Sequence, residues 1–220
     1  MKKTKQLTEL VFILDRSGSM QDLEKDTIGG FNSMIKKQKD SKVNALVTTV
    51  LFDDESVVLH DRVKIDEVPE MTNKEYYARG MTALLDAVGS TIKHIETIQK
   101  YARKEDKPAK TLFMITTDGY ENSSRTYTFK KVKQLIEKQK EKNGWEFVFI
   151  GSNMDAIESA SKIGISRDYA ATSMGDEKGT EVLYKTVGDV CCCCCLEAEP
   201  LKPNWKEKIE KDDLQRKKTK

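Results

Sequence analysis

Histidine and cysteine, on which much catalysis, metal binding and cross-linking depends, are scarce in this sequence of 220 residues. The two histidines, His60 and His94, fall on an expected edge strand and on the polar face of an expected helix, so they form no cluster. The five cysteines form one run, Cys191 to Cys195. A disulfide framework spreads its cysteines along the chain, and neighbouring Cα atoms, about 3.8 Å apart, lie closer than a disulfide usually allows. The sequence therefore argues against a disulfide-stapled fold, and it offers no histidine to activate a nucleophile.

The sequence also lacks an excess of either charge, and it lacks long apolar segments. Its 38 Lys+Arg nearly balance its 36 Asp+Glu, which leaves a formal net charge of +2. Such a balance gives no strong attraction to nucleic acid or to a membrane surface. The apolar run at residues 10–14 is too short for a signal peptide, and no segment approaches the length of a membrane-spanning helix. We therefore expect a cytoplasmic protein that binds neither nucleic acid nor membrane.

The cysteine run has three interpretations. On a helix, Cys191 shares a face with Cys194 and Cys195, which provides too few ligands for a closed metal site. Lipidation lacks the flanking membrane segment that would support it. The third interpretation, which we favour on composition alone, is a repeated codon or a reading-frame change that has overwritten the natural end of the last helix.

Apolar runs that resemble strands alternate with amphipathic segments along most of the chain. The expected strands are 8–14, 43–52, 56–65, 110–117, 145–151 and 168–172. The expected helices are 20–40, 82–103, 129–142, 154–163 and 177–190. Only three residues separate the second and third strands, too few for a crossover helix, so these two strands should form an antiparallel hairpin. The pattern predicts the α/β class: a doubly wound, mostly parallel central sheet with one antiparallel edge strand and helices on both faces.

The alternating pattern ends after Val190. We expect one domain over residues 7–190, then the cysteine run at 191–195 and a charged C-terminal tail at 196–220. The tail contains Pro200 and Pro203 and is then dense in charges of both signs. Such a segment is typical of a frayed, solvated helix.

The most informative motif lies where the first apolar run ends, in V-F-I-L-D-R-S-G-S-M. Asp15, Ser17 and Ser19 alternate along the chain, and alternate side chains of an extended segment point the same way. Parallel sheets place their ligands at the carboxyl ends of strands, so one carboxylate and two hydroxyls should converge there. Hard oxygen donors suit Mg²⁺, Mn²⁺ or Ca²⁺ rather than zinc or copper. On its own, however, such a motif more often marks a helix cap.

Two later positions extend the motif. Thr82 lies in R-G-M-T-A-L-L-D-A, a loop that leads into a helix, and Asp118 lies in M-I-T-T-D-G-Y-E-N, at the end of the next buried strand. In this order the three blocks resemble the von Willebrand factor type A (VWA) domain with its metal-ion-dependent adhesion site (MIDAS), over about residues 7–190. The resemblance implies a Rossmann-like sheet with the first strand near the centre and the 56–65 strand at an edge.

The resemblance also implies a ligand set for a divalent cation, Mg²⁺ or else Mn²⁺ or Ca²⁺. In VWA domains the two serines coordinate directly, the two aspartates commonly act through water, and the threonine joins as the site changes state. The implied metal site consists of Asp15, Ser17, Ser19, Thr82 and Asp118.

We expect a non-enzymatic module that binds a partner protein. Hydroxyl ligands are neutral, so two carboxylates leave a divalent cation incompletely neutralised, and an open coordination position favours a Glu or Asp side chain from the partner. The alternative is a metal-dependent phosphoryl hydrolase of the haloacid dehalogenase type, which also begins with an Asp at the end of its first strand. Its chemistry requires a second carboxylate two residues later as acid and base, where this chain has Ser17.

Overall fold

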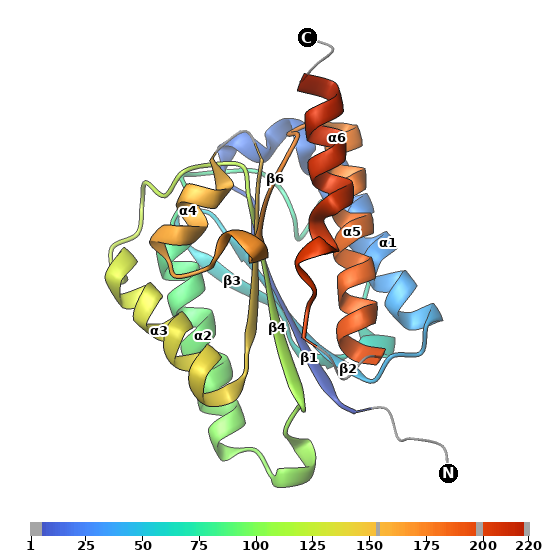
Figure 1. Cartoon of the computed structure of the whole chain (residues 1–220), viewed down its shortest axis with the longest axis vertical. Helices are drawn as coiled ribbons and strands as arrows, with labels where there is room; N and C mark the ends of the chain where they lie inside the picture. The colour runs from blue at the N-terminus through green and yellow to red at the C-terminus, as the bar shows by residue number, and fades with distance from the viewer. Residues whose placement is uncertain (1–5, 153–154, 197–199, 218–220) are drawn as a thin grey trace.

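A six-stranded sheet lies between two layers of helices in the computed structural model, which describes residues 6–152, 155–196 and 200–217 (Figure 1). The spatial order of the strands is β3-β2-β1-β4-β5-β6. All neighbouring pairs are parallel except β2 and β3, which form the expected antiparallel hairpin at one edge. The strands are β1 (Thr8–Asp15), β2 (Ala45–Phe52), β3 (Ser56–Lys64), β4 (Lys110–Thr117), β5 (Glu146–Ser152) and β6 (Ala170–Ser173). The predicted fold class is confirmed.

The helices divide between the two faces of the sheet (Figure 1). One face carries α1 (Glu24–Asp40), α5 (Glu177–Leu196) and α6 (Glu207–Lys217). The other carries α2 (Leu84–Tyr101), α3 (Phe129–Asn143) and α4 (Ala156–Lys162). Strand β1 shows why both faces are covered: Leu10, Phe12 and Leu14 belong to the core under α1 and α5, whereas Val11 and Ile13 belong to the core under α2 and α3. A strand buried on both faces has a continuous apolar run, as residues 10–14 have in this sequence.

The first predicted helix differs at its beginning. The sequence predicts an α-helix over residues 20–40, but the chain first forms the 3₁₀ helix η1 (Gly18–Leu23), and α1 begins at Glu24. The N–H of Met20 donates to the carbonyl of Ser17 at 2.9 Å, the short i→i+3 bond of a 3₁₀ turn. The other 3₁₀ turns are η2 (Ile65–Glu67), η3 (Lys104–Asp106), η4 (Arg167–Tyr169) and η5 (Pro203–Lys206). The first residue expected in the fourth helix, Met154, lies outside the described residues.

Residues 200–217 pack onto the domain, which differs from the solvated tail that the sequence predicts. Ile209 is 1% exposed and lies in the core beside α5, with Leu201 and Trp205 packed against the same cluster. Lys206 is 7% exposed, and its ammonium group donates to two backbone carbonyls around η4, at 2.7 and 2.9 Å. These three apolar residues come from the segment before η5, from η5 and from α6, and they face the same cluster.

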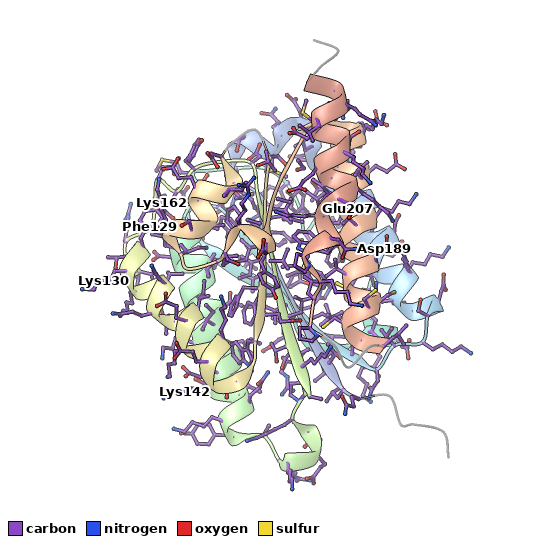
Figure 2. All side chains as sticks on the ribbon, in the orientation of Figure 1. Phe129, Lys130, Lys142, Lys162, Asp189 and Glu207 are labelled. Carbon is purple, nitrogen blue, oxygen red and sulfur yellow. The ribbon has the colours of Figure 1, made fainter. Side chains whose placement is uncertain are left out.

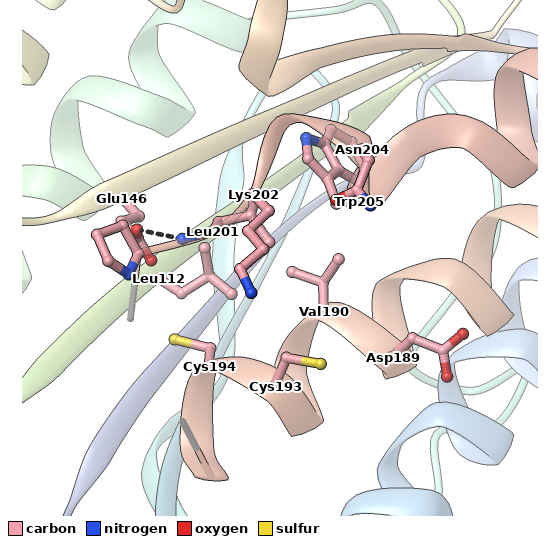
Figure 3. A pocket seen from close by; sticks show the side chains of 11 residues that line it. Leu112, Glu146, Asp189, Val190, Cys193, Cys194, Leu201, Lys202, Asn204 and Trp205 are labelled. Carbon is pink, nitrogen blue, oxygen red and sulfur yellow. Dashed lines mark hydrogen bonds between the residues drawn. The ribbon is translucent and has the colours of Figure 1, made fainter. Parts of the chain in front are cut away.

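The cysteine run forms the end of α5. Cys191, Cys194 and Cys195 are buried on the same face of the helix, as the helical spacing predicts, and Cys193 is exposed. Burial raises the pKa of the Cys194 thiol to about 12 and the pKa of Cys191 as well, so both thiols stay protonated. Cys193 and Cys194 line a cavity of about 230 Å³ between α5 and the segment that carries Trp205 (Figure 3). The buried cysteines therefore serve as small apolar side chains in the core.

The outer faces of the helices are strongly charged, as Lys130 and Lys142 of α3 illustrate in Figure 2. Across the described ranges, no helix is both long enough and apolar enough to cross a lipid bilayer.

Candidate functional site

The candidate site lies at the carboxyl edge of the sheet, near its middle. Asp15 ends β1, which lies between β2 and β4, and Asp118 follows the end of β4. The N–H of Arg16 donates to the carbonyl of Phe52 at 2.8 Å, which continues the pairing of β1 with β2 by one residue. The N–H of Gly18 then donates to the carbonyl of Gly80 at 3.1 Å. This bond joins the loop after β1 to the loop that leads into α2 and carries Thr82.

The structure brings together all five predicted site residues. The hydroxyl oxygen of Ser19 lies 2.5 Å from Oδ1 of Asp118 and 3.1 Å from the hydroxyl oxygen of Ser17. Asp15 accepts hydrogen bonds from the N–H of Ser17 at 2.7 Å and, through its other oxygen, from the hydroxyl of Thr117 at 2.5 Å. Two carboxylates and several hydroxyls thus meet at one point of the sheet edge.

Thr82, in the loop that leads into α2, lies beside Gly119 at the same part of the sheet edge. A Cβ atom on Gly119 would lie 3.0 Å from Oγ1 of Thr82 and 3.5 Å from Oγ of Ser19. Both hydroxyls therefore face the same glycine, and a larger residue at 119 would crowd them. The absence of a side chain at Gly119 keeps this part of the site open.

Burial of the two carboxylates has an electrostatic consequence. Asp15 is 1% exposed, and its burial raises its pKa to about 6, although hydrogen bonds from Ser17 and Thr117 act in the opposite direction. The negative charge of Asp118 raises the pKa of Asp15 further, and burial also raises the pKa of Asp118. The ionised pair is therefore unfavourable without a positive charge nearby. A divalent cation at this point would supply that charge.

The side chains of the candidate site that could bind a metal ion all offer oxygen atoms. Among the residues that the structure describes, no three His, Cys, Asp or Glu side chains are placed to hold a metal ion. The candidate site has two carboxylates and three hydroxyls instead. These are hard oxygen donors, which fit Mg²⁺, Mn²⁺ or Ca²⁺ better than a soft metal.

A buried ion-pair cluster lies beside the site, at the turn that joins β2 to β3. The acidic run at residues 53–55 is typical of a solvated turn. Asp53, however, is 1% exposed, and one of its oxygens lies 2.8 Å from Nε of both Arg16 and Arg79. Although burial raises the pKa of Asp53, the hydrogen bonds from Arg79 and from the N–H of Glu55 and the two positive charges outweigh it and hold the pKa below its usual value. Arg16, within the D-x-S-x-S motif, therefore anchors the loop after β1 to the end of β2.

The loop after β4 and the start of α2 also hold each other. The N–H of Thr82 donates to Oδ1 of Asn122 at 2.8 Å, and the N–H of Asn122 donates back to the carbonyl of Thr82 at 3.1 Å. The N–H of Leu85, in the first turn of α2, donates to Glu121 at 2.8 Å. Glu121 thereby satisfies an N–H group that the helix start leaves free, whereas Asn122 pairs with the backbone just before the helix. No periodicity in the sequence could reveal them, because the caps come from a segment about 40 residues away along the chain.

We expect the substitution Asn122→Ala to lower the free energy of unfolding by about 1–3 kcal/mol, because it leaves the N–H of the buried Thr82 without a partner. Urea denaturation of the metal-free protein would measure the change. The variant Asn122→Asp keeps an oxygen acceptor and should unfold close to the wild type. Equal stability of Asn122→Ala and the wild type would show that this bond does not hold the two loops together.

Comparison with known proteins identifies the fold. No protein-family model and no curated protein sequence matches the chain. Solved structures do match it. A von Willebrand factor type A protein from Catenulispora acidiphila aligns with a TM-score of 0.57 and 16% identity, over 86% of this chain and 43% of that one. The von Willebrand factor domain of a type V pilus tip protein from Porphyromonas gingivalis aligns with a TM-score of 0.61 and 10% identity, over 90% of this chain and 99% of that one.

A third structure, proximal thread matrix protein 1 from the mussel byssus with a zinc-occupied MIDAS motif, aligns with a TM-score of 0.58 and 16% identity. The match covers 85% of this chain and 46% of the mussel protein, so the chain spans less than half of that relative. At such low identities the likeness concerns the backbone. The chain has the fold of the von Willebrand factor type A domain.

Proposed function

We propose that the five residues of the site bind a divalent cation and that the cation receives a carboxylate from a partner protein. The chain is then a protein-binding module and not an enzyme. The observation that carries this proposal is the convergence of Asp15, Ser17, Ser19 and Asp118 at the carboxyl edge of the sheet, with Thr82 beside them. The VWA fold supports it, and one protein with this fold is known with zinc in its MIDAS motif.

Each residue has a part in this proposal. The hydroxyls of Ser17 and Ser19 bind the cation directly, and the carboxylates of Asp15 and Asp118 balance its charge. The bound cation supplies a positive charge that attracts and orients an incoming carboxylate. Asp15 is held in place by the N–H of Ser17 and the hydroxyl of Thr117, so its oxygens are positioned before any ligand arrives. Because the hydroxyls that bind it directly are neutral, the cation attracts an acidic side chain to its open coordination position.

The hydrolase alternative finds less support in these contacts. A haloacid dehalogenase reaction needs a carboxyl group two residues after the first Asp, to protonate and deprotonate the reacting oxygens. Ser17 occupies that position, and its hydroxyl lies 3.1 Å from the hydroxyl of Ser19. Hydrolysis of a generic phosphate ester in Mg²⁺, if abolished by Asp15→Asn, would favour the hydrolase over the binding module.

We expect partner capture to depend on both the cation and the two serines. In a pulldown, proteins retained by the wild type in Mg²⁺ should be lost in EDTA and should not bind the double variant Ser17→Ala, Ser19→Ala in either buffer. Ser33→Ala is the matched control, because Ser33 is an exposed serine of α1 outside the site. Partners that are retained regardless of EDTA and of the double substitution would contradict the proposal.

A further inference from the structure

Two of the loops that form the candidate site carry large apolar side chains that are exposed to solvent. Met81, which directly precedes Thr82, is 51% exposed. Tyr120, two residues after Asp118, is 57% exposed. The N–H of Thr82 donates to Oδ1 of Asn122 at 2.8 Å, so the two loops lie side by side. An apolar residue therefore adjoins the proposed cation site in each of these loops.

A third exposed ring, that of Tyr77, lies beside the loop after β1. Tyr77 is exposed and belongs to the chain between η2 and α2. The guanidinium carbons of Arg16 and Arg79 lie 5.5 and 5.7 Å from the centroid of its ring. Its neighbour Tyr76 is buried, and the hydroxyl of Tyr76 donates to the carbonyl of Asp15. Exposed apolar side chains thus adjoin all three segments that contribute to the site.

The loops that carry Met81 and Tyr120 are held by hydrogen bonds to other segments. Oδ1 of Asp54 accepts from the N–H of Met81 and from the hydroxyl of Ser123, both at 3.1 Å, and so joins the two loops. The hydroxyl of Tyr120 accepts from the N–H of Asp155 at 3.2 Å, which holds the polar end of the ring. Side chains that are held in place before binding lose less conformational entropy when a partner covers them.

Scattered apolar residues are normal on protein surfaces and need no functional explanation. Tyr101, at the end of α2, and Leu214, in α6, are exposed residues of this kind, because each lies on a helix outside the loops of the site. Tyr77, Met81 and Tyr120 differ, because all three lie in the loops around the site. Aromatic residues and methionine are enriched in protein interfaces. Their position and their type together are typical of a surface that a partner covers.

The position of these residues limits the chemistry of the partner. The cation of the proposed site attracts a carboxylate, and the neighbouring side chains of the partner then meet the loops around the cation. Met81 is one residue from Thr82, and Tyr120 is two residues from Asp118. In an extended partner segment, a residue one or two positions from the acidic one lies within about 7 Å of it, because consecutive residues advance by about 3.3 Å. Its side chain can therefore reach Met81 or Tyr120.

We propose that the partner segment carries a large apolar side chain one or two positions from its acidic residue. The inference rests on the proposed function, because the acidic residue is the one that binds the cation. The apolar side chain packs against Met81 and Tyr120 and thereby determines which acidic segments bind. Met81 and Tyr120 are residues of specificity: they contact the partner and do not contribute to the binding of the cation.

Fluorescence anisotropy with labelled heptapeptides would test this inference. The first peptide has a central aspartate between glycines, the second has the same aspartate between leucines, and the third has an asparagine between leucines. In Mg²⁺, the wild type should bind the second peptide at least about tenfold more tightly than the first, because burial of a leucine side chain adds to the affinity. Neither the third peptide in Mg²⁺ nor any peptide in EDTA should bind with an affinity comparable to that of the second; equal binding of the second and third peptides would contradict the inference.

The double variant Met81→Ser, Tyr120→Ser should lose the preference of about tenfold for the leucine peptide and still bind Mn²⁺ within about twofold of the wild type. The matched control is Tyr101→Ser, Leu214→Ser, which removes exposed apolar side chains outside the site. Equal affinities of the wild type for the two aspartate peptides would overturn the inference, as would equal losses in both double variants, and cation-dependent capture would still stand. If neither aspartate peptide binds more tightly in Mg²⁺ than in EDTA, the proposed function fails and the inference fails with it.

Discussion

Asp53→Asn is expected to lower the free energy of unfolding by about 3–5 kcal/mol, which is large for a residue in a turn. The guanidinium of Arg16 is 4% exposed, and Asp53 is the carboxylate with which it pairs, at 2.8 Å. Nε and one terminal nitrogen of Arg16 already lack a hydrogen bond, so the ion pair with Asp53 is what compensates its buried charge. Removing the negative charge while the positive one stays buried costs far more than losing an exposed pair. Urea or thermal unfolding in EDTA would measure the loss.

Two neighbouring variants serve as controls for this effect. Asp54→Asn removes the same charge one residue later, but Asp54 is exposed and an asparagine still offers an oxygen to its partners, Met81 and Ser123. Arg79→Gln removes the second, half-exposed arginine of the cluster. We expect each control to cost about 1 kcal/mol or less. If Asp53→Asn is as mild as Asp54→Asn, the buried pair does not stabilise the loop after β1.

Most of the fold and the position of the candidate site can be predicted from the sequence, because the order and direction of the strands determine where each strand ends in space. A run such as residues 10–14, apolar at every position, indicates a strand covered on both faces. Once the strands are parallel, every strand ends at the same edge, so Asp15 and Asp118 must lie near one another although about 100 residues separate them. The convergence of these carboxylates therefore needed no knowledge of side-chain contacts.

The features that the sequence did not reveal depend on partners that are distant along the chain. Arg16 and Asp53 show no local pattern that marks them as a buried pair, and a run of three acidic residues normally indicates a solvated turn. The first turn of α2 is likewise held by another segment, because Glu121 and Ser124 accept from the N–H groups of Leu85 and Asp86. The sequence predicts a helix near the C-terminus but not its packing, because the charges of α6 hide the single core residue Ile209, which packs beside Trp205 of η5.

Asp118→Ala is expected to lower the affinity for Mn²⁺ on the order of 100-fold. It removes one of the two negative charges of the proposed ligand set and the acceptor of the hydrogen bond from Ser19. Titration of the metal-free protein with Mn²⁺, followed by electron paramagnetic resonance of the free ion, would measure the affinity. Asp22→Ala is the matched control, because Asp22 is an exposed carboxylate of η1 outside the set. Unchanged Mn²⁺ affinity in Asp118→Ala, or the same loss in both variants, would contradict the proposed site.

The effect of Asp118→Ala on the melting temperature distinguishes a metal-binding site from a cluster that only stabilises the loops. Burial raises the pKa of Asp118, so its ionised form at neutral pH costs stability in the metal-free protein. Asp118→Ala should therefore melt at or above the wild-type temperature in EDTA. In Mn²⁺ at about 100 times its dissociation constant, the wild type should gain about 2.7 kcal/mol and the variant almost nothing, so the order of the two melting temperatures reverses. A variant that melts equally far below the wild type in both buffers would mean that Asp118 and Ser19 stabilise the loops without a metal.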